Sequence, residues 1–137
     1  MNFDDLKLSD PIVRSLKDQK YDKPTPIQAE VIPAILNNSD VMAAAQTGTG
    51  KTAAFVLPIL HKLSDPKNAF KGHQLRALII TPTRELAAQV NENVNTYSKY
   101  LGTRSTAVYG GARIHNQQLK LRKGVEVLVA TPGRLLD

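Results

Sequence analysis

One run of eight residues in this chain has the residue types and spacing of a phosphate-binding loop. The run reads Ala45-Gln46-Thr47-Gly48-Thr49-Gly50-Lys51-Thr52. Its two glycines let the backbone curl so that successive N–H groups point into one concavity, where a polyphosphate can accept their hydrogen bonds. Lys51 follows at the position that reaches terminal phosphates, and the Thr52 hydroxyl follows at the position that binds Mg²⁺. The spacing therefore predicts a nucleoside triphosphate site.

The residues around this loop support that prediction over a simpler one. The strict loop pattern has glycine where Ala45 stands, so the alternative is a turn rich in glycine and threonine that precedes a lysine. However, Asp40–Ala44 is a short apolar run of strand length, and residues 51–63 continue as a mostly apolar helix. Strand, loop and helix in this order form the context that a phosphate-binding loop requires.

The rest of the chain alternates between expected helices and expected strands. We place the helices by proline in a first helical turn, by hydrophobic residues spaced three and four apart, and by a glycine after the last helical residue. We place the strands by short continuous apolar runs. We expect Pro33 to kink or divide the helix that starts at Pro26, and Thr83 to cap a long helix that ends before Gly102. The expected helices cover residues 10–19, 26–36, 51–63, 83–101 and 113–123, and the expected strands cover 40–44, 76–81, 105–109 and 125–130.

This alternation predicts an α/β fold with a parallel sheet and helices on both of its faces. Ligands of such sheets bind outside the carboxyl ends of the strands. Three unusual segments follow expected strands, in addition to the phosphate loop: Pro82-Thr83-Arg84-Glu85, Gly110-Gly111 and Thr131-Pro132-Gly133-Arg134. Taken alone, each segment is more often only a helix cap or a turn. Together they indicate a second site for a polyanion at the same sheet edge.

Composition and charge narrow the class of protein. The 137 residues have a net charge of +6, 42% hydrophobic content and no cysteine, which excludes disulfides and thiolate metal sites. Residues 93–125 contain lysines and arginines but no acidic residue, so nucleic acid is a plausible partner and a solvated basic face is the alternative. The sequence has no signal peptide and no apolar run long enough to cross a membrane, and we expect a cytoplasmic protein with no membrane partner. It does not predict an oligomeric state.

These segments together resemble the N-terminal part of a DEAD-box ATP-dependent RNA helicase, across essentially the whole chain. Lys23–Gln28, with Phe3 upstream, resembles the Q motif of that family, and residues 45–52 resemble its motif I, in which alanine is the usual first residue. Residues 82–87 resemble motif Ia, Gly110-Gly111 the paired-glycine motif, and residues 131–134 motif Ib. The sequence around residues 97–101 and 120–125 is most similar to that of the bacterial RhlE subgroup.

The resemblance implies ATP and Mg²⁺ as cofactors and RNA, single-stranded or duplex, as the partner. Gln28 would read the adenine edge, Phe3 would pack near the base, and Thr52 would bind the metal. The full set implied for nucleotide binding is Phe3, Tyr21, Lys23, Thr25, Gln28, Ala45, Gln46, Thr47, Gly48, Thr49, Gly50, Lys51 and Thr52. The set implied for the RNA sugar-phosphate backbone is Pro82, Thr83, Arg84, Gly110, Gly111, Thr131, Pro132, Gly133 and Arg134.

The chain also departs from the family pattern. Lys20 stands where family members have glycine, and the sequence reaches Asp137 without the Asp-Glu-Ala-Asp motif, the Ser-Ala-Thr motif or the second RecA-like domain. We therefore expect a Q-motif region over residues 1–30 and an incomplete RecA-like P-loop domain over 31–137, with no catalytic residue and little ATP hydrolysis by this chain alone. A sheet that lacks inner strands is also expected to be marginally stable.

Three functions remain open at this point. The first is part of an ATP-dependent RNA helicase that binds ATP and RNA to remodel RNA duplexes. The second is an ATP-binding and RNA-binding fragment without turnover. The third is an unrelated P-loop enzyme such as a small kinase, which would leave Pro24–Gln28 and residues 82–85 unexplained.

Overall fold

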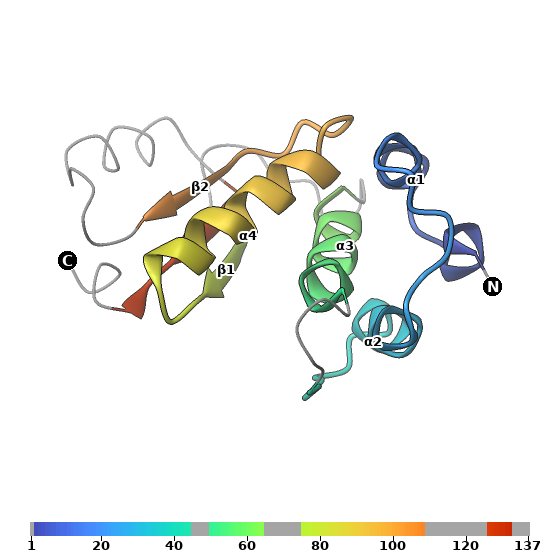
Figure 1. The fold of residues 1–137 in the computed structure, drawn as a ribbon, viewed down its shortest axis with the longest axis horizontal. Helices are drawn as coiled ribbons and strands as arrows, with labels where there is room; N and C mark the ends of the chain where they lie inside the picture. Colours follow the sequence, from blue (N-terminus) through green and yellow to red (C-terminus); the bar gives the residue numbers. More distant parts are fainter. Residues whose placement is uncertain (1, 45–49, 65–74, 109–125, 133–137) are drawn as a thin grey trace. The chain divides into compact units, whose positions relative to one another are not determined.

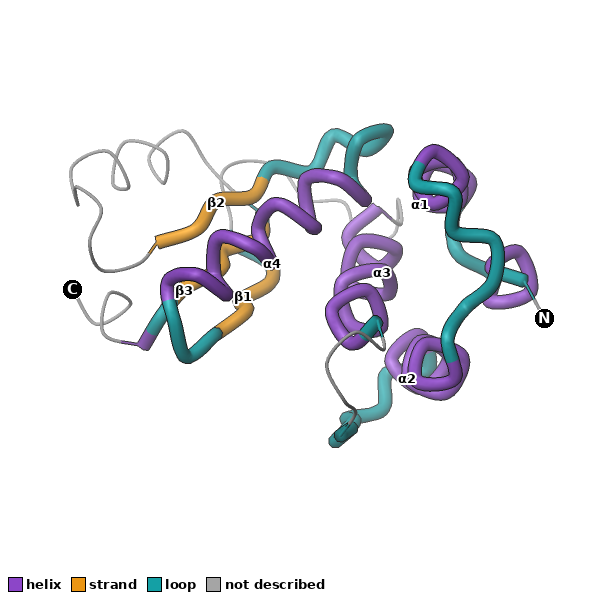
Figure 2. Tube along the Cα trace, viewed as in Figure 1, coloured by secondary structure: helices purple, strands orange, loops and turns teal. Residues whose placement is uncertain are grey.

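A computed structural model describes residues 2–44, 50–64, 75–108 and 126–132. These residues fall into two compact units, Met1–Asn68 with Thr96–Gly102, and Ala69–Asn95 with Thr103–Asp137. Figure 1 shows the elements of both units along the chain, and Figure 2 distinguishes helices, strands and loops. Each unit is described on its own.

The first unit is built from helices. They are the 3₁₀ helix η1 (Phe3–Leu6), α1 (Asp10–Asp18), α2 (Pro26–Leu36) and α3 (Lys51–Ser64). Helices α2 and α3 pack against each other most extensively, and α1 also contacts α3. The fully buried side chains of the unit include Ile12, Leu16, Ile32 and Leu57. Helix α1 buries one apolar face, which includes Ile12 and Leu16, as the spacing of its hydrophobic residues predicted.

Local sequence signals explain where these helices begin and end. Asn2 and Asp5 form a capping box at η1, with the Asn2 N–H donating to Asp5 Oδ2 at 2.9 Å. Helix α1 ends in a Schellman motif, in which the Tyr21 N–H donates to the Leu16 carbonyl and the Lys20 N–H to the Lys17 carbonyl, both at 2.9 Å. Lys20 adopts the left-handed conformation this motif requires, with φ of 61°. The turn geometry expected of a glycine is thus kept by a lysine.

One expectation for the first unit is wrong and another is wrong in part. Pro33 does not divide α2, which runs from Pro26 to Leu36, because packing of Val31 and Ile32 in the core maintains a helix that lacks one N–H donor. Asp40–Ala44 does not form a strand, and the Met42 side chain is fully exposed. A strand requires a neighbour to pair its backbone groups, and no described strand pairs with Asp40–Ala44.

The second unit contains a parallel sheet. Its strands are β1 (Ala77–Ile80), β2 (Ser105–Val108) and β3 (Val127–Ala130), in the spatial order β1-β3-β2. Ile80 and Val108 both align with Ala130, so the carboxyl ends of the strands coincide. These strands fall within the predicted ranges, and the α/β class with a parallel sheet is confirmed. The predicted helix at 113–123 lies outside the described residues.

Helix α4 (Arg84–Tyr97) follows β1. The Ser105 hydroxyl at the start of β2 lies 2.9 Å from the Oδ1 atoms of both Asn91 and Asn95 on α4, and can donate a hydrogen bond to either of them. On the opposite face Val108, Leu128 and Ala130 form a small buried cluster. Leu78 and Ile80 share that face but are 46% and 54% exposed. The described part of the sheet is therefore better covered at β2 and β3 than at β1.

Candidate nucleotide and nucleic-acid binding sites

Thr25 and Gln28 form a reciprocal cap at the start of α2. The Thr25 N–H donates to Gln28 Oε1 at 3.0 Å, and the Gln28 N–H donates to Thr25 Oγ1 at 3.4 Å. Pro26 occupies the first helical turn, where its missing N–H is not needed. This capping box fixes the Gln28 side chain at the helix end.

Gln28 also reaches the end of the phosphate-loop sequence. Its Nε2 donates to the carbonyl oxygen of Gly50 at 3.2 Å, across 22 positions of sequence. The same Gly50 carbonyl accepts the Ala54 N–H at 3.1 Å, which is a first hydrogen bond of α3. Gln28 is buried, with 6% of its surface exposed. One side chain thus ties the start of α2 to the start of α3.

A residue larger than glycine at position 50 would force the Gln28 side chain to move. Its φ of 87° is rarely adopted by residues with a side chain. A Cβ at this position would overlap Gln28 Nε2 and lie 3.1 Å from Gln28 Cδ and 3.2 Å from Thr25 Oγ1. The glycine therefore permits both the turn into α3 and the close approach of the Gln28 amide.

Lys51 and Thr52 occupy the first two positions of α3. Lys51 is exposed and Thr52 is partly exposed, so the ammonium and hydroxyl groups are accessible beside the free N–H groups of a helix start. Lys51 also lines a cavity of about 200 Å³ with Val31, Val41 and Phe55. Ala45, Gln46, Thr47, Gly48 and Thr49 lie outside the described residues.

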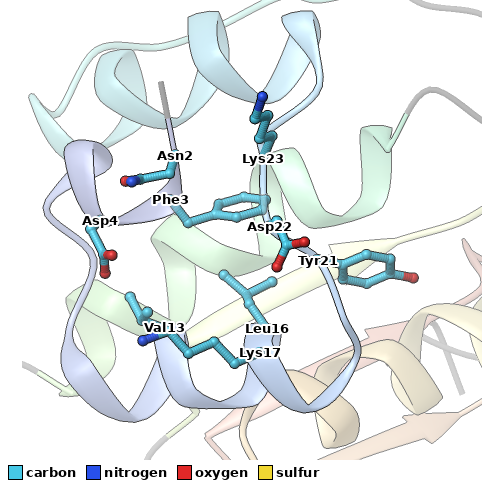
Figure 3. Close-up of a pocket in the computed structure, with 9 residues that line it drawn as sticks. All are labelled: Asn2, Phe3, Asp4, Val13, Leu16, Lys17, Tyr21, Asp22 and Lys23. Atoms are coloured by element: carbon cyan, nitrogen blue, oxygen red, sulfur yellow. The ribbon is translucent and has the colours of Figure 1, made fainter.

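Three other residues of the predicted nucleotide set line a single pocket. Phe3, Tyr21 and Lys23 border a space of about 280 Å³ together with Asn2, Asp4, Val13, Leu16, Lys17 and Asp22. In Figure 3 the Phe3 ring extends toward Asp22 and Lys23, whereas Tyr21 points away from it. Phe3 is only 4% exposed and Tyr21 is 50% exposed. Phe3 is therefore a buried anchor of this pocket, and Tyr21 is the accessible aromatic ring.

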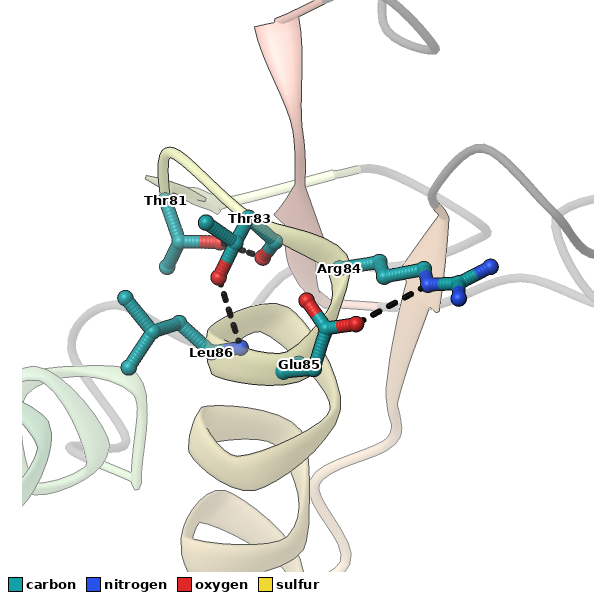
Figure 4. Close-up of polar contacts among 5 residues, drawn as sticks. All are labelled: Thr81, Thr83, Arg84, Glu85 and Leu86. Atoms are coloured by element: carbon teal, nitrogen blue, oxygen red, sulfur yellow. Dashed lines mark hydrogen bonds and ion pairs between the residues drawn. The ribbon is translucent and has the colours of Figure 1, made fainter.

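The predicted polyanion residues after β1 form a compact turn (Figure 4). Thr83 Oγ1 accepts the Leu86 N–H at 3.2 Å, which confirms Thr83 as the cap of α4. Thr81 Oγ1 donates to the Thr83 carbonyl at 3.2 Å and closes the turn around exposed Pro82. Free N–H groups and hydroxyls at this helix start can bind an anion.

Arg84 is the exposed cation of this turn. Its Nε donates to Glu85 Oε1 at 3.0 Å, and the two side chains are 60% and 72% exposed. The Arg84 hydrogen bond lowers the pKa of the Glu85 carboxyl. Because only Nε is engaged in this bond, the planar fork of the guanidinium can still approach a phosphate.

The end of β3 brings a second predicted segment to the same sheet edge. Thr81 and Thr131 follow adjacent parallel strands, and the Thr81 N–H donates to the Ala130 carbonyl at 2.9 Å. Thr131 is buried at 9% exposure, and its N–H donates to the Val108 carbonyl at 3.2 Å. Pro132 is exposed, while Gly110, Gly111, Gly133 and Arg134 lie outside the described residues.

Sequence reasoning missed one further polar cluster, in the first unit. The Tyr100 hydroxyl donates to Asp18 Oδ2, Lys99 Nζ lies 3.5 Å from the same oxygen, and Arg14 stacks on the Tyr100 ring. The partners are separated by more than 80 positions, so no local pattern could have indicated them. The described residues hold no group of three or more His, Asp or Glu side chains that could form a metal site by themselves. None of the described helices is long and apolar enough to cross a membrane.

Comparison with known proteins places these features in a family. The sequence profile of the DEAD/DEAH box helicases matches residues 25–137. The chain is 44% identical over 136 residues to the DEAD-box ATP-dependent RNA helicase RhpA of Helicobacter pylori, and 52% identical over 136 residues to the ATP-dependent RNA helicase DeaD of Escherichia coli. It is 45% identical over 130 residues to the human probable ATP-dependent RNA helicase DDX46.

These matches cover 99%, 98% and 95% of this chain, but only 26%, 21% and 13% of the respective relatives. The chain thus spans about a quarter or less of the length of these curated relatives. Its profile match includes Thr25, Gln28, the phosphate-loop run and both segments at the carboxyl edge of the sheet. On the strength of this match, the chain belongs to the DEAD/DEAH box helicase family.

Proposed function

We propose that this chain is the N-terminal part of an ATP-dependent RNA helicase that remodels RNA duplexes, and that this part binds ATP and RNA. The observation that carries the proposal is the Gln28 amide, which contacts both Thr25 and Gly50. This arrangement connects the residues that would select the base to the loop that would hold the phosphates. The relatives RhpA and DeaD are named ATP-dependent RNA helicases.

Nucleotide selection would use the hydrogen-bonding capacity that Gln28 has left. A primary amide offers two N–H donors and an oxygen with two lone pairs. Gln28 uses one donor on Gly50 and one lone pair on Thr25, which leaves one donor and one acceptor for an adenine edge. Tyr21 and Lys23 are exposed nearby in the sequence and would contact the base or ribose.

Phosphate binding would use the start of α3. Lys51 would neutralise charge on the terminal phosphates, and the N–H groups of the first helical turn would donate to them. Thr52 would hold Mg²⁺ through its hydroxyl, and that ion would neutralise charge on the phosphate oxygens. The exposure of Lys51 and Thr52 fits this role.

RNA binding would use the carboxyl edge of the sheet. The Thr83 and Thr131 segments follow adjacent strands, and Arg84 is exposed beside them. Hydroxyls, helix-start N–H groups and arginine contact sugars and phosphates without reading bases. We therefore expect binding of single-stranded RNA that depends little on sequence and weakens with salt.

The test uses the complete protein that contains this chain. Affinities for ATP and GTP are measured by calorimetry with Mg²⁺, and ATPase activity is measured with and without RNA. We expect ATP to bind more tightly than GTP, Gln28→Ala to reduce that preference, and Lys51→Ala to abolish RNA-stimulated ATP hydrolysis. RNA and ATP binding without any hydrolysis would favour the non-catalytic alternative, and a preference for ATP that does not depend on Gln28 would contradict the proposed base contact.

A further inference from the structure

Three polar side chains join α4 to the start of β2, and we call them the α4 clamp: Asn91, Asn95 and Ser105. The Ser105 hydroxyl oxygen lies 2.9 Å from Asn91 Oδ1 and 2.9 Å from Asn95 Oδ1. Asn91 and Ser105 are partly buried, and Asn95 is exposed. All three belong to the second unit, as do Thr83 and Arg84. The clamp and this part of the proposed RNA site therefore lie within one compact part of the protein.

The clamp shows which face of the sheet α4 covers. Ser105 aligns with Val127 on β3, and side chains two positions apart on a strand share a face, so Val129 lies on this face too. Val127 and Val129 are fully buried. The buried apolar residues of α4 are Ala87, Val90 and Val94. Because Ser105 contacts α4, we infer that this apolar stripe covers the face of Val127 and Val129.

Apolar contact alone defines the rotation of α4 on the sheet only loosely. Burial of apolar surface is non-directional and depends on the area removed from water. A hydrogen bond, in contrast, weakens steeply when its donor and acceptor move apart or lose alignment. The Ser105 hydroxyl is within reach of two asparagines that lie one helical turn apart on the same side of α4. The clamp therefore fixes both the rotation of α4 and its position along β2.

The clamp also sets the start of α4 level with the carboxyl ends of the strands. Only residues 81–83 separate β1 from α4, so α4 begins at the carboxyl end of β1. From Asn91 back to Arg84, α4 is about 10 Å long at 1.5 Å rise per residue. From Ser105 to Val108, β2 is also about 10 Å long. With the clamp closed at one end, Arg84 thus lies at the carboxyl edge of the sheet.

Arg84 lies on the same side of α4 as the clamp. Arg84 and Asn91 are seven positions apart, which places them within about 20° of each other around a helix. Figure 4 shows the Arg84 and Leu86 side chains on opposite sides of the helix start. A rotation of α4 that breaks the clamp therefore turns Arg84 away from its present direction by the same angle.

We propose that Asn91 and Ser105 are positioning residues of the RNA site, because they hold the rotation of α4 that directs Arg84 at the carboxyl edge of the sheet. This inference rests on the proposed function. Ser105 starts β2, at the end of the strand away from that edge, so the clamp acts through Arg84 and not by touching RNA. Without the clamp, α4 stays packed by its apolar stripe, but Arg84 has to be ordered when RNA binds and contributes less to affinity.

The test is a double-mutant cycle on RNA affinity in the complete protein. Affinity for a labelled single-stranded oligoribonucleotide is measured by fluorescence anisotropy over a range of salt concentrations. Asn91→Ala and Ser105→Ala are each made with and without Arg84→Ala. Asn93→Ala is the matched control, because it makes the same change on the other side of α4. Alanine favours a helix more than asparagine does, so an affinity loss in Asn91→Ala does not arise from a weaker helix.

We expect Asn91→Ala and Ser105→Ala each to lower RNA affinity about fivefold when Arg84 is present, and less than about twofold when combined with Arg84→Ala. Each should also reduce the slope of log affinity against log salt concentration toward that of Arg84→Ala, since the phosphate contact is weakened. Asn93→Ala should bind RNA as the wild type does.

Two results would overturn the inference: an unchanged RNA affinity in both clamp variants, or affinity losses of equal size with and without Arg84→Ala. A clamp that only stabilises the fold would give the second result, because its loss would not depend on Arg84. Failure of the wild-type protein to bind RNA, or an Arg84→Ala variant with unchanged affinity and salt slope, would instead refute the proposed RNA site.

Discussion

From the contact between Gln28 and Gly50 we predict how much a substitution of Gly50, at the end of the phosphate-loop sequence, lowers stability. In Gly50→Ala the new methyl group would overlap Gln28 Nε2, and the residue would have to keep a φ of 87°. The left-handed backbone costs a residue with a side chain about 1–2 kcal/mol. Displacement of the Gln28 amide removes hydrogen bonds of about 1 kcal/mol each. We therefore expect Gly50→Ala to cost about 3 kcal/mol of local stability.

The same geometry predicts how Gly50 and Gln28 depend on each other. In Gln28→Ala the side chain that collides with the new Cβ is absent, so only the backbone cost and the Thr25 contact remain. Adding Gly50→Ala to Gln28→Ala should then cost about 1–2 kcal/mol, and the pair should be non-additive by about 1 kcal/mol. A non-additivity of about 1 kcal/mol in the free energy of ATP binding corresponds to about a fivefold difference in ATP affinity.

The assay is a double-mutant cycle in the complete protein. ATP affinity is measured by calorimetry and stability by thermal denaturation for the wild type, both single variants and the double variant. Gly102→Ala serves as the control, because a Cβ at Gly102 would meet nothing within 4 Å. Additivity within about 0.5 kcal/mol would refute the argument that Gln28 holds Gly50 directly.

Four further predictions follow from single contacts. Lys20→Gly should stabilise the protein by about 0.5–1 kcal/mol in chemical denaturation, because Lys20 has φ of 61° at the end of α1; a loss of stability would contradict this. Thr83→Ala should cost about 1 kcal/mol and Thr83→Ser much less, as amide exchange in the first turn of α4 would show. The pKa of Asp18 is lowered from 3.8 chiefly by Tyr100, so its stabilising effect is complete above that value and is lost as the pH falls through the lower folded-state pKa. Acid unfolding of Tyr100→Phe should therefore depend less steeply on pH in this range than that of the wild type. Arg84→Ala should reduce the slope of log affinity for RNA against log salt concentration by about one, which corresponds to one lost phosphate contact. An unchanged slope would show that Arg84 does not contact the RNA.

The sequence by itself determined the local structure and the family. Thr83 caps its helix as its type and position predicted, and the strands at 77–80, 105–108 and 127–130 lie within the predicted apolar runs. These features depend on neighbours within a few residues, where hydrogen-bonding side chains and hydrophobic spacing act directly. The nucleotide and RNA residue sets stay predictions, because they need ligands to test them.

Only the tertiary structure decided which distant residues meet. The Asp40–Ala44 segment is apolar enough for a strand but has no described partner, and a strand exists only with one. The contact of Gln28 with Gly50 and that of Asp18 with Tyr100 span 22 and 82 positions, and each depends on how helices pack. Pro33 stays within an undivided helix for the same reason. Local sequence determines which conformations of a segment are low in free energy, whereas burial and long-range hydrogen bonds select among them.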